Sequence, residues 1–242
     1  MGQADIGGFR SWSFTHAGAK RAANEDALVD RPKIGLWAVA DGAGGHSAGA
    51  LASGILAECL QGMPDGLSHD AAVMEVRRRV DAAHQEMGSE ATRRGQGIIV
   101  ASTLVVLVVR ERQYTCLWAG DSRAYLLRGG QFRQLTRDHS LVQSLVDAGA
   151  ITAEEAAHHP RGNVITRAVG ADDAGFALDA ISGEVDPGDR LLLCSDGLNK
   201  SLTDLEIAAQ LAGAGPAEAL IKAALEKHAT DNVTAVAVEI MA

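Results

Sequence analysis

Three aspartates stand at the ends of short apolar runs. Asp41 and Asp196 each follow such a run and open an Asp-Gly dipeptide, and Asp231 lies just before a third run. Runs of this length that are bounded by turn residues predict buried strands. A carboxylate at the end of a buried strand is costly unless its charge is compensated. Three of them indicate one shared compensating group, for which a divalent cation is the natural candidate. A single Asp-Gly pair is more often an ordinary turn, which is our interpretation of Asp65-Gly66.

An arginine and two acids lie shortly before the first of these runs. They are Arg21, Glu25 and Asp26, within the segment Arg-Ala-Ala-Asn-Glu-Asp. An arginine beside acids is usually a solvated ion pair, but an arginine near a metal cluster makes a good bidentate clamp for phosphate. The segment therefore suggests a phosphate-binding side chain next to the expected cation.

A glycine-rich stretch and a fourth aspartate extend the pattern. Asp41 begins the sequence Asp-Gly-Ala-Gly-Gly-His, whose glycines let the backbone approach a ligand closely and whose Gly42 carbonyl is able to face a cation. Asp121 lies between two expected strands, either as the tip of a hairpin turn or as a fourth carboxylate of the same cluster.

Several common catalytic motifs are absent from the sequence. Ser47 stands where a dinucleotide-binding loop needs its third glycine, and no Gly-Lys-Ser/Thr marks a P-loop. Leu193 stands where a nucleophile elbow needs glycine, so Ser195 is interpreted as structural rather than nucleophilic. The eight histidines include no His-Glu-x-x-His pattern, which argues against zinc. We therefore expect residues such as His139 to make local hydrogen bonds.

Composition narrows the class of protein. The chain has 242 residues, 47% of them hydrophobic, which fits one large domain with a sizeable core. No run of about 18 apolar residues and no secretory leader is visible, so no membrane insertion is expected. The formal net charge of −9 and the aromatic content of 4% argue against nucleic acid as a partner. Three cysteines without a Cys-x-x-Cys pair predict reduced core residues in a cytoplasmic protein.

The hydropathy pattern predicts strands grouped in mid-chain and paired helices elsewhere. This order favours α+β layering over a regular strand-helix alternation. Residues 138–170 are expected to form an irregular insertion between strands. The expected strands are 9–15, 34–40, 98–109, 114–119, 124–127, 190–195 and 233–240, and the expected helices are 47–60 (capped by Ser47), 69–87, 203–212 and 216–228.

Seven short motifs, taken in order, resemble those of a known family. The chain resembles the bacterial branch of the metal-dependent Ser/Thr protein phosphatases of type 2C, from about residue 9 to residue 240. One motif would be a weak signal, but seven in family order are specific. The matching residues are Arg21 with Asn24-Glu25-Asp26; Asp41-Gly42 with Gly44-Gly45-His46; Ala101-Ser102-Thr103; Ala119-Gly120-Asp121-Ser122-Arg123; Leu135-Thr136 with Asp138-His139-Ser140; Gly188-Asp189 with Ser195-Asp196-Gly197-Leu198; and Asp231-Asn232-Val233-Thr234.

The resemblance implies an α+β fold. In this fold, a four-layer αββα sandwich, two antiparallel sheets pack together and helices cover both outer faces. The resemblance further implies a single domain over residues 1–242, with the metals at one end of the sandwich. A flap subdomain would lie at about 138–170, where the irregular insertion falls.

The resemblance also implies a centre for Mn²⁺ or Mg²⁺, in agreement with the hard oxygen ligands. Two ions about 3.5–4 Å apart would lower the pKa of a bridging water and stabilise its in-line attack on phosphorus, without a covalent phosphoenzyme. Arg21 would hold the phosphate oxygens, and Asp121 with Asp196 matches a third, weaker site of bacterial members. The implied ligands are Asp41 as the bridge, Asp196, Asp231 and the Gly42 carbonyl, with Glu25 through a water and Asp26 in support.

One position departs from the family pattern. Eukaryotic relatives carry a histidine directly after the first Asp-Gly, and this histidine is proposed to protonate the leaving alkoxide. Here that residue is Ala43, and His46 is three residues further on and does not match the role. The general acid is therefore unassigned, with a metal-bound water as the expected source of the proton. A missing acid would slow the release of a poor leaving group more than that of an activated aryl phosphate.

The leading hypothesis is a cytoplasmic phosphatase that removes phosphate from phosphoserine and phosphothreonine in proteins and opposes a bacterial Ser/Thr kinase. Some such phosphatases control secretion machines, and a role in type VI secretion is a hypothesis from size and family. One alternative is a catalytically weak binder of phosphoproteins, against which the retained Asp41, Asp196 and Asp231 count. Another is the related sandwich phosphatases that act on anti-sigma antagonists, against which the Arg21 and Asp121 motifs count.

Overall fold

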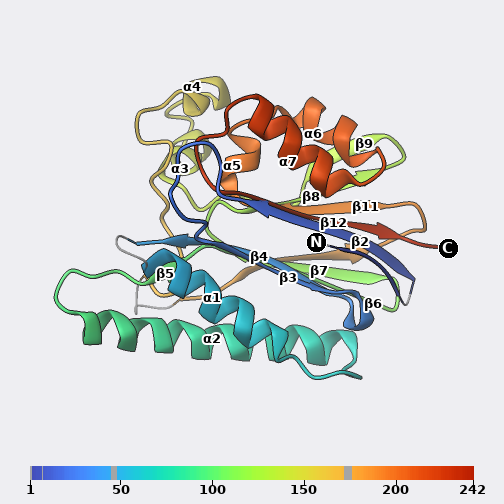
Figure 1. Ribbon diagram of the computed structural model, residues 1–242, viewed down its shortest axis with the longest axis horizontal. Helices are drawn as coiled ribbons and strands as arrows, with labels where there is room; N and C mark the ends of the chain where they lie inside the picture. Colours follow the sequence, from blue (N-terminus) through green and yellow to red (C-terminus); the bar gives the residue numbers. More distant parts are fainter. Residues whose placement is uncertain (1, 7, 45–47, 172–175) are drawn as a thin grey trace.

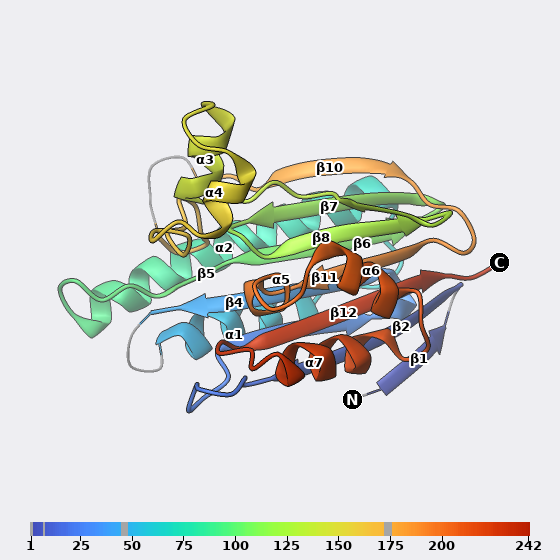
Figure 2. The same cartoon turned by 90° about the horizontal axis from the view of Figure 1, so that it is seen from above.

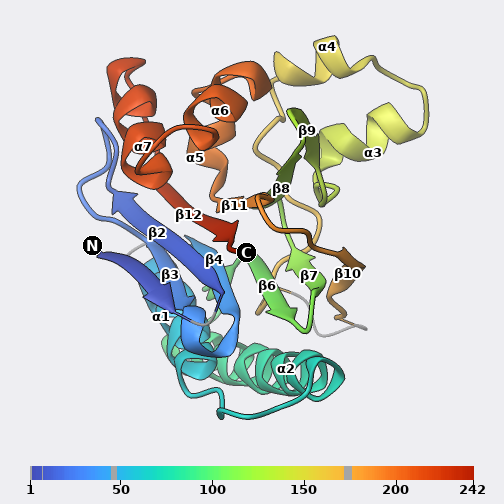
Figure 3. The same cartoon turned by 90° about the vertical axis from the view of Figure 1, so that its right-hand side faces the viewer.

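Two antiparallel sheets pack face to face, and helices cover both outer faces (Figures 1 and 3). The computed structural model describes residues 2–6, 8–44, 48–171 and 176–242. The architecture confirms the predicted α+β sandwich of four layers. Among the described residues, no helix is both long enough and apolar enough to cross a membrane.

The first sheet joins the two ends of the described chain. Its β2 strand pairs along its whole length with β12, so that Phe9 lies opposite Ile240 and His16 opposite Val233. Helices α5 (Asp196–Asn199), α6 (Asp204–Leu211) and α7 (Pro216–Glu226) cover its outer face (Figure 1). In spatial order the strands are β1 (Gly2–Ile6), β2 (Phe9–His16), β12 (Val233–Ile240), β11 (Arg190–Cys194), β8 (Arg123–Arg128) and β9 (Gln131–Gln134).

Two long helices, α1 (Ala48–Gln61) and α2 (His69–Arg94), cover the outer face of the second sheet. A short 3₁₀ turn, η1 (Pro32–Ile34), joins β3 to β4. Two further helices, α3 (Leu141–Asp147) and α4 (Ala153–Ala157), stand together at one end of the sandwich (Figure 2). In spatial order the strands are β10 (Asp179–Glu184), β7 (Gln113–Ala119), β6 (Leu104–Arg110), β4 (Leu36–Ala43) and β3 (Asp26–Arg31), with β5 (Ala101–Ser102) paired to β4.

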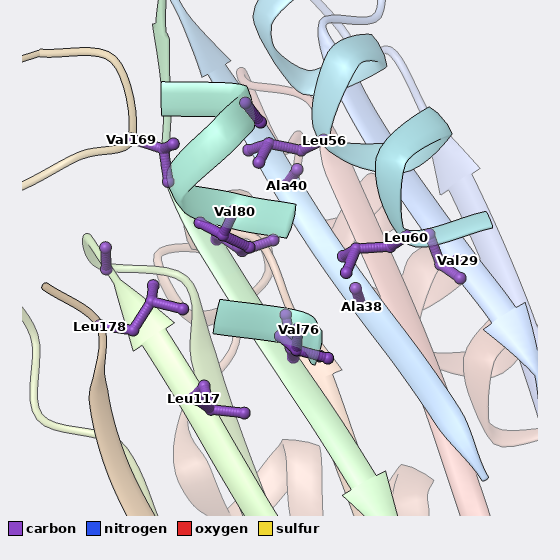
Figure 4. Close-up of a cluster of buried hydrophobic side chains, with 14 of the residues drawn as sticks. Val29, Ala38, Ala40, Leu56, Leu60, Val76, Val80, Leu117, Val169 and Leu178 are labelled. Atoms are coloured by element: carbon purple, nitrogen blue, oxygen red, sulfur yellow. The ribbon is translucent and has the colours of Figure 1, made fainter. Parts of the chain in front are cut away.

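Strand side chains alternate between two cores, because successive residues of a strand point to opposite faces. In β4, Trp37 and Val39 lie in the core between the sheets, whereas Leu36, Ala38 and Ala40 face α1 and α2. Both faces of each central strand are covered. This explains why the sequence of such a strand is a continuous apolar run rather than an alternation of apolar and polar residues. Figure 4 shows the layer under the two helices, where small alanines of β4 meet Leu56 and Leu60 of α1.

The first Asp-Gly pair is not the end of a strand, contrary to our expectation. β4 continues through it to Ala43, because Asp41 pairs with Asp26 of β3 and Gly42 pairs with Ser102 of β5. The second pair differs, since β11 ends at Cys194 and Asp196 begins α5.

Two other sequence-based expectations were wrong. The long strand predicted over 98–109 is divided into β5 and β6 at Thr103, while Ile98 and Ile99 are exposed and precede β5. Of the two interpretations of Asp121, the hairpin turn was wrong, because β7 and β8 belong to different sheets and the residue lies in the link between them. We predicted no element at β1, β3, η1, β9, β10 or α5. The 138–170 segment, whose sequence is helix-like with a break at Gly149, contains α3 and α4.

The remaining predicted elements are present with small shifts in their bounds. Helix α2 extends seven residues beyond the predicted end at Met87, to Arg94, and begins after Ser68, whose side chain accepts the Ala71 N–H. The cap proposed for α1, Ser47, lies outside the described residues, as do Gly45 and His46. The three cysteines are free thiols, of which Cys116 and Cys194 are buried, as expected for core residues.

Candidate metal centre

One end of the sandwich contains a polar cavity of about 260 Å³. It opens where β4 and β11 end and β12 begins, so that both sheets contribute to its walls. Two residues of the 138–170 segment, Asn163 and Ile165, close one side. The other lining residues are Arg21, Glu25, Asp41, Gly42, Ala43, Gly44, Thr103, Asp121, Asp196, Lys200, Asp231 and Asn232.

Asp41 is held by its backbone. Its carbonyl accepts hydrogen bonds from the Thr103 N–H and the Ser102 hydroxyl, both at 2.9 Å, and its N–H donates to the Thr103 hydroxyl at 3.2 Å. At the break between β5 and β6, Thr103 thus uses its N–H and its hydroxyl to fix the backbone of Asp41. Across the ladder Asp41 lies directly opposite Asp26. Two like charges in that position repel each other, so the pair requires a compensating cation or a proton.

Asp26 lies behind the cavity wall, at the junction of the two sheets. Its Oδ2 accepts hydrogen bonds from the hydroxyls of Ser195 at 2.8 Å and Thr234 at 2.6 Å, whereas its Oδ1 is buried without a hydrogen-bond partner in the described chain. Burial, only partly opposed by these hydroxyls, raises the pKa of Asp26 to about 6. Ser195 is therefore a positioning residue, as its failure to match the nucleophile motif suggested.

Close backbone packing shapes the wall around Gly42. The Gly42 N–H donates to the Glu25 carbonyl at 3.1 Å, and the Ser53 hydroxyl donates to the same carbonyl at 2.6 Å. A Cβ on Gly42 would lie 2.1 Å from the Gly49 carbonyl oxygen, and a Cβ on Gly49 would lie 2.7 Å from the Gly42 carbonyl oxygen. Only glycine at both positions lets the first turn of α1 approach the strand this closely.

Asp121 and Asp196 form the side of the cavity nearest to the 138–170 segment. Both are nearly buried, with 7% and 8% of their surface exposed. Burial together with the repulsion of Asp196 raises the pKa of Asp121 to about 7. The Oδ1 of Asp196 is buried and has no hydrogen-bond partner among the described residues, while its Oδ2 accepts from the ammonium of Lys200.

Histidine and threonine contacts hold the loop that carries Asp121. His139 Nδ1 accepts the Gly120 N–H at 3.1 Å, and the His139 N–H donates to the Gly120 carbonyl at 2.9 Å. The Thr103 hydroxyl lies 2.7 Å from that of Ser122. Thr103 therefore connects the two aspartates, Asp41 through its backbone and Asp121 through the adjacent serine.

An ion pair stands at the rim of the cavity. Arg21 contacts Asp231 through two bonds, Nε to Oδ1 at 2.9 Å and Nη2 to Oδ2 at 3.0 Å. Both side chains remain open to solvent, with 55% and 33% of their surface exposed. The next residue, Asn232, accepts the Glu25 N–H at 2.9 Å and donates to the carbonyls of residues 17 and 23. Asn232 thus anchors the segment that presents Arg21 and Glu25.

The donor set fits hard divalent cations. Burial raises the pKa of Asp41 well above its ordinary value, and the charges of Asp26, Asp196, Asp121 and Asp231 raise it further. Carboxylates crowded in this way are normally compensated by a cation. The two orphaned oxygens, on Asp26 and Asp196, are the acceptors that such a cation would satisfy. Within the described residues no three such side chains already converge on one point, and two of them instead pair with Lys200 and Arg21.

The structure brings together the residues singled out in the sequence. Seven of the eight candidate residues line the cavity, and the eighth, Asp26, lies beside Asp41 behind the wall. Sequence reasoning assigned no role to Thr103, Asn232 or Lys200. Thr103 and Asn232 belong to motifs that we had noted, so these motifs could have indicated that both residues support the site. Lys200 lies four residues after Asp196. This spacing predicts contact between the two side chains only if the segment is helical, and we did not predict α5.

The chain belongs to the Protein phosphatase 2C family, whose sequence profile matches residues 15–231. It is 35% identical to protein phosphatase PhpP of Streptococcus pneumoniae over 234 residues, covering 91% of this chain and 93% of that protein. It is 34% identical to Ser/Thr protein phosphatase PstP of Mycobacterium tuberculosis over 227 residues. That match covers 93% of this chain but only 43% of PstP, so the chain spans less than half of this longer relative.

Solved structures share the same fold. PppA, described as a key regulatory component of the type VI secretion system in Pseudomonas aeruginosa, superposes with a TM-score of 0.89 at 42% identity, covering 97% of this chain and 98% of PppA. The catalytic domain of PstP, solved in complex with two manganese ions, superposes with a TM-score of 0.83 at 32% identity, covering 97% and 99% of the two chains.

Proposed function

We propose that this protein hydrolyses phosphoserine and phosphothreonine in proteins by a metal-dependent reaction. The observation that carries the proposal is the pairing of a buried carboxylate cluster with an exposed arginine on the rim of the same cavity. Membership of the Protein phosphatase 2C family and the Mn²⁺ complex of PstP support it. Two divalent ions, Mn²⁺ or Mg²⁺, would activate a water molecule and neutralise the developing charge on the phosphoryl group.

The chain's own residues would divide the work between holding cations and holding phosphate. Asp41 would bridge the two ions, joined by Asp196, Asp231 and the Gly42 carbonyl. Glu25 would act through a water and Asp26 from behind Asp41, with its free Oδ1 available. Asp121 lies close enough to Asp196 for their charges to repel each other, and it would add to the negative field of the cavity.

Arg21 would turn from Asp231 to the phosphate of the substrate. Its guanidinium already presents a two-pronged geometry to a carboxylate, and a phosphoryl group offers oxygens at similar spacing. The methyl group of Ala43 lines the cavity but has no proton to donate. The proton for the leaving alkoxide must therefore come from another source than position 43.

We also propose that the 138–170 segment is a flap that selects protein substrates within a single domain of residues 1–242. A cavity of about 770 Å³ separates α3 and α4 from α5 and the start of α6 and continues to Asp121 and Asp196. A chain flanking the phosphorylated residue would fit such an extended groove better than a small phosphate ester would.

For the cellular setting, we propose a cytoplasmic phosphatase that opposes a Ser/Thr kinase and acts on type VI secretion. The secretion role depends on the likeness to PppA, 42% identical with nearly complete coverage of both chains. Deletion of the gene should raise phosphorylation of the forkhead-associated scaffold of that system. Unchanged phosphorylation of the scaffold would reject this setting without touching the chemistry.

The experiment for the chemistry is phosphate release from a phosphothreonine peptide. Activity should require Mn²⁺, disappear in excess chelator, and be lost in Asp41→Ala. If the wild type binds Mn²⁺ but releases no phosphate from peptides or phosphoproteins, the alternative of a non-catalytic phosphoprotein binder is correct instead.

A further inference from the structure

A lysine of the chain itself stands among the acids of the centre. Lys200 directly follows α5, and its ammonium donates to Oδ2 of Asp196 while its N–H donates to the Asp196 carbonyl at 2.9 Å. The double attachment follows from their spacing, since residues four apart in a helical turn are neighbours on its surface. The Lys200 side chain is 37% exposed, so that the stem reaches in from the surface and the charged end enters the cavity.

The two oxygens of Asp196 have different surroundings. Oδ1 is buried and has no hydrogen-bond partner in the described part of the chain, as befits an atom that awaits a cation. Oδ2 is occupied by the Lys200 ammonium. The carboxylate thus has one oxygen without a partner and one oxygen that already holds a positive charge.

The lysine also acts on the second acid of this wall. Lys200 and Asp121 line the same two cavities together with Asp196. The lysine charge favours the ionised form of Asp121, which the charge of Asp196 opposes. Lys200 therefore compensates the pair Asp121 and Asp196 jointly, which is the role that the family resemblance gave to a third, weaker metal ion.

We propose that Lys200 takes the place of the third ion, so that this chain holds two divalent cations and excludes a third from Asp121 and Asp196. The inference rests on the proposed metal centre and concerns its occupancy. An ammonium at Oδ2 repels a divalent ion and blocks one of its few available ligands. Unlike a weakly held ion, a tethered charge does not depend on the metal concentration.

Counting bound ions tests this proposal without reference to activity. Mn²⁺ bound per chain would be measured by equilibrium dialysis and elemental analysis, at Mn²⁺ concentrations up to several millimolar. The variants are Lys200→Met, which keeps the stem and removes the charge, Asp121→Asn, and the two combined. Lys222→Met serves as the matched control, because Lys222 is an exposed lysine on α7, away from the cavity lining.

We expect two ions per chain in the wild type, in Asp121→Asn and in Lys222→Met. Lys200→Met should bind a third ion at least tenfold more tightly than the wild type does, and Lys200→Met/Asp121→Asn should return to two. The double variant shows whether the new ion uses Asp121, which a merely structural effect of Lys200 would not produce. Thermal unfolding of each variant confirms that it is folded.

Three results would overturn the proposal. They are a third ion in the wild type that Asp121→Asn removes, an unchanged count of two in folded Lys200→Met, and a third ion in Lys200→Met that survives the loss of Asp121. A wild type that binds no Mn²⁺ would reject the proposed centre itself, and this outcome is distinguishable from all three.

Discussion

The inner carboxylates and the rim pair of this cavity handle charge in different ways. The inner carboxylates, Asp26, Asp41 and Asp196, are packed where the two sheets meet, and two of their oxygens lack a partner among the described residues. The rim pair, Arg21 with Asp231, is exposed and neutralises itself. Burial raises the pKa of Asp26 and Asp41, so the ionised form of these acids is disfavoured without a bound cation. The difference supports the proposed division of the site, in which the interior holds metal ions and the rim binds an anion that competes with Asp231.

Of the changes considered, Asp41→Asn should damage the inner carboxylates, and with them the activity, most severely. The change keeps the size of the side chain but removes the charge that would bridge two ions, and with it several kcal/mol of stabilisation. We expect kcat/KM for a phosphothreonine peptide to fall by about 10³-fold or more, with a loss of Mn²⁺ affinity. Asp65→Asn is the control, since Asp65 also precedes glycine but has a side chain that is 79% exposed. Activity within tenfold of wild type in Asp41→Asn would contradict the assignment.

Arg21→Ala should affect the substrate and spare the metal. Hydrogen bonds to charged groups contribute about 1.5–3 kcal/mol, so kcat/KM should fall by about tenfold to 100-fold, and Arg21→Lys should recover part of it. Mn²⁺ affinity should stay the same or rise, because Asp231 loses its partner. If Arg21→Ala weakened Mn²⁺ binding as Asp41→Asn does, the rim and the interior would not be separate.

The pH dependence of stability should sharpen the comparison. The pKa of Asp26 is raised to about 6, so the metal-free folded state binds this proton more tightly than the unfolded chain does. Stability is then present at low pH and is lost as pH rises from about 4 through about 6, by roughly 3 kcal/mol for this group. The raised pKa of Asp121, about 7, extends the loss toward neutrality.

Thermal unfolding in chelator, from pH 5 to pH 8, measures this effect. The melting temperature of the metal-free protein should fall with rising pH, and Asp26→Asn should flatten the fall. Added Mn²⁺ should reverse the trend, because a cation favours the ionised acids. A metal-free melting temperature that rises over this range would show that the inner acids are compensated without metal.

A pair of glycine substitutions on α1 provides the finest comparison. Gly49→Ala would press a methyl group against the Gly42 carbonyl and the Glu25 carboxylate, where contacts would be 2.7 to 3.0 Å. We expect Mn²⁺ affinity to fall by about tenfold, in the range of effects seen for residues that orient metal ligands. Gly54→Ala on the same helix meets no atom within 4 Å and should raise stability slightly, by about 0.5–1 kcal/mol. Equal effects of the two changes on Mn²⁺ binding would contradict the role of the Gly42–Gly49 contact.

The sequence was a good guide to the carboxylates and a poor guide to what holds them. Asp-Gly after an apolar run is a local pattern, so Asp41 and Asp196 could be found from neighbours alone. The contacts of Thr103 with Asp41, and of Asn232 with Glu25, join segments more than 60 positions apart. No local periodicity records such pairing, which depends on how the two sheets are connected.

The strand through Asp41 shows a second reason for error. Asp-Gly is a turn signal, and we therefore ended the strand there. In the structure β3 and β5 pair with both sides of this segment and supply the hydrogen bonds that keep it extended. Tertiary pairing overrides the local preference. The split at Thr103 has the same origin, because the bonds to Asp41 draw this residue out of the long apolar run.

The pairing of β2 with β12 has a consequence for the synthesis of the protein. Arg21 and Asp231 are 210 positions apart, which takes a ribosome about 10–40 s at 5–20 residues per second. Until the segment after Asp231 emerges, the loop that carries Glu25 lacks its Asn232 anchor and β2 lacks its neighbour. The proposed metal centre is therefore the last part of the fold to become possible, and a nascent chain cannot complete it before translation reaches β12.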